Sequence, residues 1–232
     1  MICAIHQPQT YPWLGYFAKI MQADIFIFLD NVQFKKNEWQ NRNKIRTPQG
    51  WIWLTVPVIH HFGQKIDEVK INNTVNWRKK HLQTLQTYYG RAPFFKLYFE
   101  KIENLYQFEW QNLAQFNITA IRLLMSLIGI DTPTIIASEI KALNQNSQIS
   151  AAERLIIATK AVGADCYLSG IGGCNYLQPE LFAKNDIKLK FQSFEHPVYR
   201  QMTNDFLPNM SILDLLFNEG QRANSISQEG IR

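Results

Sequence analysis

Residues 2–30, with the sequence ICAIHQPQTYPWLGYFAKIMQADIFIFLD, decide the fold of this chain. Apolar runs at 2–5 and 25–29 lead into His6 and Asp30, and such runs are typical of strands buried on both faces. A helix is expected between them, starting near Pro12, because proline fits the first helical turn. Parallel strands present their carboxyl ends at one sheet edge, where ligands bind. We therefore expect His6 and Asp30 to lie beside a small-molecule site.

The same alternation of strand and helix returns after a helical middle section. Further strands are predicted at 51–58, 68–71, 134–137, 165–168 and 187–191. Helical spacing of apolar residues predicts a block of helices from 75 to 129, a capping box starts a helix at Ser150, and Ser211 starts the last helix. This order predicts an α/β fold with three layers, a mostly parallel, Rossmann-like sheet and a helical insertion. The expected parts are an α/β core domain (1–74 and 130–220), a helical insertion or cap (75–129) and a flexible tail (221–232).

Composition indicates a globular protein with a mild positive charge. The chain has 232 residues, 46% of them hydrophobic and 19% charged, and its formal net charge is +5. A basic balance suits a phosphorylated ligand, although many ordinary cytosolic proteins share it. The three cysteines lack the spacing of a disulfide framework or a CxxC site. Neither a signal-peptide pattern nor an apolar run of about 18 residues is present, so we expect a cytoplasmic protein without a membrane span.

The loop after the first strand contains the first group of candidate site residues. His6 can act as acid, base or hydrogen-bond donor near neutral pH, and we assign His6 and Asp30 as the candidate catalytic residues. Candidate substrate-binding residues in this loop and the helix after it are Gln7, Trp13, Gly15 and Tyr16. Each of these residues also has a structural alternative. His6 could simply be bonded to a backbone carbonyl, Trp13 and Tyr16 could pack in the core, and Asp30 could be a cap or turn residue.

A basic segment after the second strand supplies the next candidates. Its candidate binding residues are Gln33, Lys36, Asn41, Arg42 and Asn43. Arginine binds phosphate or carboxylate through two parallel hydrogen bonds. Basic groups interleaved with amides and Trp39 can also follow a nucleic-acid backbone, and the alternative is a solvated basic loop.

A glycine-rich turn after the strand at 165–168 supplies the third group. Its candidates are Ser169, Gly170, Gly172, Gly173 and Tyr176, followed after the last strand by His196, Tyr199 and Gln201. Backbone amides of such a turn can cradle a phosphate or an acyl oxygen, although the lysine and spacing of a Walker loop are missing. A plain flexible turn is the alternative. No metal site is predicted, because adjacent histidines such as His60 and His61 point to opposite faces of a strand.

Several long sequence blocks resemble the WbqC-like protein family. They are HQPQTYPWLGYFAKI (6–20), ADIFIFLDNVQFKKNEWQNRNKI (23–45), WLTVPV (53–58), DCYLSGIGGCNYL (165–177), HPVYRQ (196–201) and FLPNMSILDLLFNEG (206–220). The resemblance covers nearly the whole chain, in order. It implies a role in bacterial surface-polysaccharide (O-antigen) biosynthesis, as an enzyme that transfers an acyl or aminoacyl group, such as glycyl, to an amino sugar.

These observations lead to one main functional hypothesis and two alternatives. The main hypothesis is a transferase that moves an acyl or aminoacyl group onto a nucleotide-linked amino sugar, with residues near 6, 30, 42 and 170 around a shared anion-binding hollow. Its partners would be a phosphorylated or nucleotide-linked substrate and an activated donor, for which aminoacyl-tRNA is one option. The alternatives are an ATP-dependent nucleotidyl-transferring or ligase-like enzyme, suggested by a similar layout in adenylyl-forming folds, and a non-enzymatic tRNA-binding or assembly factor.

Overall fold

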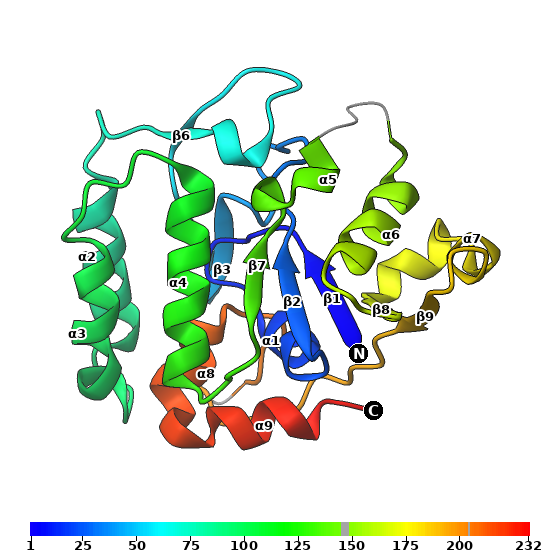
Figure 1. The fold of residues 1–232 in the computed structure, drawn as a ribbon. Coiled ribbons are helices and arrows are strands. Elements are labelled where there is room, and N and C mark those ends of the chain that lie inside the picture. The colour runs from blue at the N-terminus through cyan, green and yellow to red at the C-terminus, as the bar shows by residue number, and fades with distance from the viewer. Residues whose placement is uncertain (145–148, 204) are drawn as a thin grey trace.

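A five-stranded parallel sheet forms the centre of the computed structural model, which describes residues 1–144, 149–203 and 205–232. Figure 1 shows the strands side by side. In sheet order they are β7 (Thr134–Ile136), β2 (Ile25–Phe28), β1 (Ile2–His6), β8 (Cys166–Ser169) and β9 (Lys188–Phe191). In chain order this is 3-2-1-4-5, so the chain crosses from one side of β1 to the other between β7 and β8. The topological switch point therefore lies between β1 and β8.

The pairing of β1 with its two neighbours ends at different heights. Its register with β2 continues to the pair His6 and Phe28. With β8 the register stops at Ala4 and Leu168, although β8 itself continues to Ser169 beside β9. The two central strands thus separate at their carboxyl ends.

Helices cover both faces of the sheet, which confirms the predicted three-layer α/β fold. Ala4, Phe26 and Phe28 belong to one hydrophobic cluster, together with buried residues of α1 (Leu14–Met21), α4 (Leu113–Leu127) and α8 (Ile212–Glu219). Cys3 and Ile27 face the opposite way and pack with residues of α5 (Lys141–Asn144), α6 (Ala151–Ala161) and α7 (Pro179–Ala183). Alternate residues of a strand point to opposite faces, so continuous apolar runs are needed here.

The predicted helical block consists of α2 (Trp77–Tyr89), α3 (Phe95–Leu105) and α4. Their buried side chains belong to the same cluster as the α1 face of the sheet. The capping box at Ser150 is also present: the Ser150 hydroxyl accepts from the Glu153 amide, and the Glu153 carboxylate accepts from the Ser150 amide.

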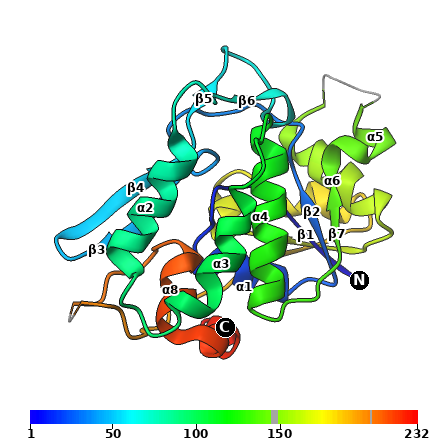
Figure 2. The same cartoon turned by 90° about the vertical axis from the view of Figure 1, so that its left-hand side faces the viewer.

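Two small antiparallel pairs lie outside the main sheet. The predicted strand at 51–58 divides into β4 (Gly50–Thr55), which pairs with β3 (Arg42–Thr47), and β5 (Val58–Ile59), which pairs with β6 (Lys70–Ile71). Strand β3 was not predicted, because its sequence RNKIRT looks like a basic loop. Figure 2 shows the β3–β4 hairpin extending away from the parallel sheet beside α2.

The remaining short elements are 3-10 helices and a C-terminal helix. The 3-10 helices are η1 (Ile66–Glu68), η2 (Ala137–Glu139), η3 (Ile171–Asn175) and η4 (Gly220–Arg222). The tail that its polar composition predicts to be flexible instead forms α9 (Ala223–Glu229), which buries Ala223 and Ile226 and packs against α1. After α9, Ile231 bridges Phe194, and the Arg232 amide donates to the Ser193 carbonyl at 3.1 Å. No helix in the described ranges has the length and apolar character needed to cross a bilayer.

A buried amide fixes the loop after β1 against the segment that precedes β3. The Asn117 side chain on α4 donates to the Gln40 carbonyl at 2.7 Å and accepts from the Thr10 hydroxyl at 2.9 Å. The Gln40 side chain in turn donates to the side-chain oxygen of Gln7 at 2.7 Å. Asn117 is fully buried, so these hydrogen bonds cannot be replaced by water without rearrangement.

Replacing Asn117 by Ala should lower the free energy of unfolding by about 2–4 kcal/mol, because the buried Gln40 carbonyl and Thr10 hydroxyl would lose a partner. Gln115→Ala, on the exposed side of the same helix, is the matched control and should change stability by less than about 0.5 kcal/mol. Urea denaturation of both variants measures this, and equal stabilities would contradict the structural role of Asn117.

Candidate functional site

A pocket of about 790 Å³ opens where β1 and β8 separate, and we call it the switch-point pocket. His6 and Gln7 line it from the end of β1, and Ser169, Gly170 and Gly173 line it from the end of β8. Its wall also includes residues after β2 (Leu29, Val32, Gln33 and Lys35) and around the start of α6 (Ile149, Ala151, Arg154 and Leu155). Its volume lies in the range of small-molecule sites.

The charge of this pocket is positive. Lys19, Lys35 and Arg154 line it, and none of its described lining residues is an aspartate or glutamate. Apolar side chains, among them Leu29 and Leu155, supply much of the remaining wall. Such a pocket is complementary to a ligand that combines an anionic group with an apolar or ring-shaped part.

A second hollow of about 380 Å³, the side pocket, adjoins the first. The two share four lining residues: His6, Lys19, Gly170 and Gly172. The side pocket is otherwise uncharged, and its remaining lining residues are Trp13, Gly15, Tyr16, Ile171, Gln192, Ser193 and Phe194.

His6 is a half-buried, neutral ring in the wall between the pockets. Its Nδ1 lies 3.1 Å from the Gln7 carbonyl, so Nδ1 carries the proton and Nε2 remains an acceptor. Its ring meets the Tyr16 ring edge to face at 4.9 Å. Desolvation, with a smaller effect of the Lys19 charge, lowers the pKa of His6 to about 3. A histidine with this pKa accepts hydrogen bonds well at neutral pH and accepts protons poorly.

Lys19 is the most unusual side chain in the site. It lies on α1, four residues after Gly15, and only 2% of its surface is exposed. Its Nζ donates to the Ile5 carbonyl at 2.8 Å, one residue beyond the last β1–β8 pair. Burial lowers the pKa of Lys19 to about 7. The ammonium thus satisfies a carbonyl that the separating strands leave without a β-sheet partner.

The glycine turn lies at the pocket and contributes little side-chain bulk. Gly173 packs so closely against the Ser169 hydroxyl that a β-carbon there would overlap it. Gly170 and Gly172 have open space where a side chain would be. This turn forms the 3-10 helix η3, which holds the backbone close to the pocket.

The structure brings most of the predicted residues of the first and third groups together, with Gln33 from the second group. Those that line one or both pockets are His6, Gln7, Trp13, Gly15, Tyr16, Gln33, Ser169, Gly170, Gly172, Gly173 and Tyr176. The expectation that the end of β1 and the glycine turn share one sheet edge is therefore confirmed.

Asp30 lies at the same edge but does not line either pocket. Its two carboxylate oxygens accept from the amide and the hydroxyl of Ser138, at 2.9 and 2.7 Å. It is 3% exposed, and desolvation raises its pKa. Asp30 thus fixes the start of η2 against β2, which is the cap-like alternative considered for it.

Of the predicted binding residues of the basic segment, Gln33 lines the switch-point pocket, whereas Lys36, Asn41, Arg42 and Asn43 line neither pocket. Arg42 donates to the Asn37 carbonyl and lies over the Trp53 ring, 4.1 Å from its centre. Asn41 donates to the Val56 carbonyl and Asn43 to the Tyr11 carbonyl, so both hold backbone. Lys36 is exposed and lines neither pocket. The expected convergence of Arg42 with residues 6 and 170 is therefore wrong, because its segment pairs into a separate β-ribbon.

The last three predicted residues also have structural partners. Tyr199 and Gln201 both donate to the buried carboxylate of Asp214, at 2.8 and 2.9 Å. His196 stacks on Trp13 with the ring centres 6.1 Å apart, and its Nε2 accepts from the Asn209 amide. His196 therefore supports a wall residue of the side pocket without lining it.

Three basic pocket residues, Lys19, Lys35 and Arg154, are absent from the predicted site residues, although Lys35 adjoins the predicted Lys36. In the helix LGYFAKIM, Lys19 is the only charged residue, and it shares a face with Gly15 and Tyr16 at spacings of four and three. That signal was available. Arg154 follows the capping box on α6, and nothing local distinguishes it from a solvated arginine. No cluster of three or more potential metal ligands is found in the part of the chain that the structure describes.

Replacing Lys19 by Met should remove a pH-dependent cost in stability. A lysine whose pKa falls from 10.5 to about 7 on folding destabilises the protein below pH 7, and this cost fades as the pH rises towards 10.5. The stability advantage of Lys19→Met over the wild type should therefore shrink by on the order of 4 kcal/mol between pH 7 and pH 10. Denaturant titrations at several pH values measure it. Lys160→Met, at an exposed position on α6, is the control. A stability advantage of Lys19→Met that stays constant with pH would contradict the lowered pKa of Lys19.

Comparison with known proteins agrees with the resemblance seen in the sequence blocks. The model of the WbqC-like protein family matches residues 7–226. An uncharacterized protein of Mycobacterium tuberculosis, Rv1507c, is 34% identical over 224 residues, which cover 95% of this chain and 94% of that protein. No solved structure matches this chain. The chain belongs to the WbqC-like protein family.

Proposed function

We propose that this protein is a transferase of bacterial surface-polysaccharide biosynthesis that moves an acyl or aminoacyl group onto the amine of a nucleotide-linked amino sugar. The observation that carries this proposal is the switch-point pocket, which has three basic residues and no acidic residue among its described lining. Its position at the switch point of a parallel sheet is where nucleotide ligands bind in many α/β enzymes. The setting in surface-polysaccharide synthesis rests on the resemblance to the WbqC-like family.

The pocket has suitable groups for each part of such a substrate. Lys35 and Arg154 would bind the phosphates, and the apolar wall around Leu29 and Leu155 would contact the base or the sugar ring. Gln7 and Gln33 would bind hydroxyl groups. Gln7 is held for this task by its hydrogen bond from Gln40.

The reacting end of the substrate would lie near His6 and the glycine turn. The free Nε2 of neutral His6 would accept a hydrogen bond from the sugar amine and orient it. Backbone amides at Gly170 and Gly172 would stabilise the negative charge that develops on the acyl oxygen. Asp30 has no part in this scheme, because Ser138 occupies both of its oxygens.

Replacing Arg154 by Gln should weaken the binding of UDP about tenfold or more, because one charge-assisted contact to phosphate would be lost. Isothermal titration calorimetry with UDP measures this. Lys160→Gln is the control, on the same helix but outside the pocket, and its affinity should equal that of the wild type. If Arg154→Gln and the wild type bind UDP with equal affinity, the phosphates of UDP do not bind at Arg154, and the proposed phosphate site is wrong. Magnesium-dependent release of pyrophosphate from ATP, with a carboxylic acid supplied, would instead favour a ligase.

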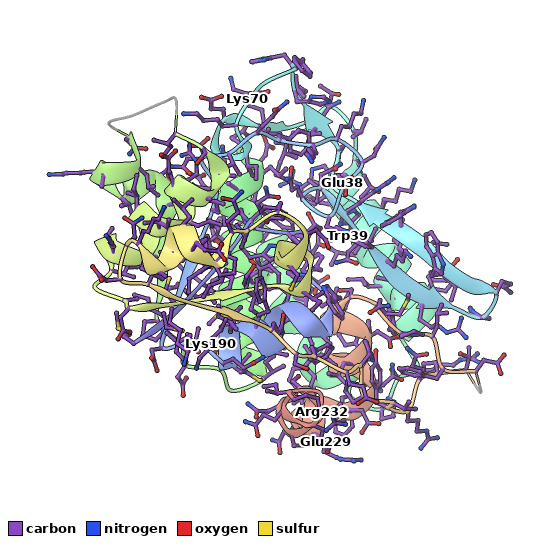
Figure 3. All side chains as sticks on the ribbon, turned by 90° about the vertical axis from the view of Figure 1, so that its right-hand side faces the viewer. Glu38, Trp39, Lys70, Lys190, Glu229 and Arg232 are labelled. Carbon is purple, nitrogen blue, oxygen red and sulfur yellow. The ribbon has the colours of Figure 1, made fainter. Side chains whose placement is uncertain are left out.

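A second candidate function is RNA binding, and the outer face of the β3–β4 hairpin favours it. The Lys44 ammonium lies among three tryptophan rings, 4.3 Å from the centre of Trp51, 5.7 Å from Trp53 and 5.8 Å from Trp39. Trp51 is 40% exposed. Figure 3 shows Trp39 and Glu38 where the hairpin joins the rest of the protein. Aromatic rings beside cations bind single-stranded nucleic acids by stacking and by phosphate contacts.

If the hairpin binds RNA, replacing Trp51 by Ala should weaken the binding of a single-stranded 12-nucleotide RNA about tenfold, because one stacking partner would be lost. Phe108→Ala removes another exposed aromatic ring, far from the hairpin in sequence, and should leave the affinity unchanged. Fluorescence anisotropy in 50–300 mM salt measures both variants. An RNA affinity that does not fall with increasing salt, or that Trp51→Ala leaves unchanged, would contradict this function.

A further inference from the structure

Among the residues that the structure describes, Lys19 is the only lysine, arginine, aspartate or glutamate that lines both the switch-point pocket and the side pocket. The two pockets meet at His6, Lys19, Gly170 and Gly172, so two bound molecules would approach each other along this shared wall. A group in this position can contact both reactants of a transfer reaction.

The buried amine of Lys19 has fewer hydrogen-bond acceptors around it than it has donors. An ammonium has three donors, and the Ile5 carbonyl is the one hydrogen-bond acceptor found for Nζ among the described residues. No carboxylate lies within 4 Å of Nζ in the described part of the chain. The titratable groups that face it are Cys3 and His6 on β1 and the ring of Tyr167 on β8, whose centre is 6.0 Å away.

Stability explains a lysine at this position only in part. Its hydrogen bond satisfies the Ile5 carbonyl, but a buried amine without an acidic partner still costs free energy. Lysines placed in this way are typical of proton-transfer and covalent sites.

Resting on the transferase function proposed above, we propose that Lys19 is the proton acceptor of the transfer, contacting the amine of the acceptor where the two pockets meet. The acceptor would occupy the switch-point pocket, and the acyl part of an ester donor would occupy the uncharged side pocket. The aromatic wall of Trp13, Tyr16 and Phe194 suits such an uncharged group.

The reaction balances without any further reactant. The acceptor amine attacks the carbonyl carbon of the ester, the C–N bond forms, and the C–O bond to the donor alcohol breaks. The proton that leaves the amine nitrogen passes to the Lys19 amine and then to the leaving oxygen, so the products are an amide and an alcohol. The desolvation that lowers the pKa of Lys19 to about 7 keeps a large fraction of its amine unprotonated at neutral pH.

Labelling with cyanate tests the state and position of Lys19 independently of activity, because cyanate modifies unprotonated amines. In the wild-type protein at pH 7.5, carbamylation of Lys19 should be at least tenfold faster than that of the exposed Lys160, as measured by peptide mass spectrometry. UDP should protect Lys19 and leave Lys160 unaffected. A Lys19 that reacts no faster than Lys160, or that UDP fails to protect, would overturn the proposal.

Kinetics of two variants test the catalytic role. Lys19→Met and Lys19→Arg should lower kcat at least 100-fold with little change in KM, and the residual rate should lose the dependence on a group that titrates near pH 7. Wild-type kcat in Lys19→Met would overturn the role of Lys19 while leaving the transferase intact. A wild-type protein that labels as expected but transfers no acyl group from any ester donor would instead overturn the transferase, and the role of Lys19 with it.

Discussion

The separation of β1 from β8 after Ala4 and Leu168 is the constraint on which the site depends. Further pairing would close the sheet over the space that now forms the switch-point pocket. The separation also leaves the Ile5 carbonyl without a strand partner, and a buried carbonyl needs a donor. Lys19 supplies it at 2.8 Å, from a helix that the first crossover places beside this gap. One local break in the β-sheet pairing thus explains both the pocket and the hydrogen bond of the buried amine.

Polar side chains hold the loops around this gap in place. Asn117 ties the loop after β1 to the segment before β3 through Gln40 and Thr10, and Gln40 then fixes Gln7 at the pocket wall. A buried polar network of this kind specifies one arrangement of its loops, because every alternative leaves a group unsatisfied. The β3–β4 hairpin begins just after Gln40, at Arg42. A molecule bound to the tryptophan rings around Lys44 would therefore lie close in the chain to the residue that positions Gln7.

The sequence predicts the parts of the fold that depend on local patterns. Apolar runs identify β1 and β2, and the capping box at Ser150 identifies the start of α6. Because strand ends of a parallel sheet share an edge, His6 and the glycine turn could also be expected to meet, and they do. Patterns fail where tertiary contacts decide: the polar strand β3 is stabilised by pairing with β4, and α9 by burying Ala223 and Ile226. The same reason applies to the site residues, since Tyr199 and Gln201 bind the buried Asp214, a partner that local sequence does not reveal. Lys19 stands out in the sequence as the single charge of an apolar helix, but its contact with the Ile5 carbonyl depends on the sheet.

Residues 230–232 support the wall of the side pocket from behind. Ile231 bridges Phe194, the Glu195 amide donates to the Gly230 carbonyl at 2.9 Å, and the Arg232 amide donates to the Ser193 carbonyl. Ser193 and Phe194 both line the side pocket. Substitutions in residues 230–232 would therefore act on the backbone that shapes this pocket, although these residues do not line it.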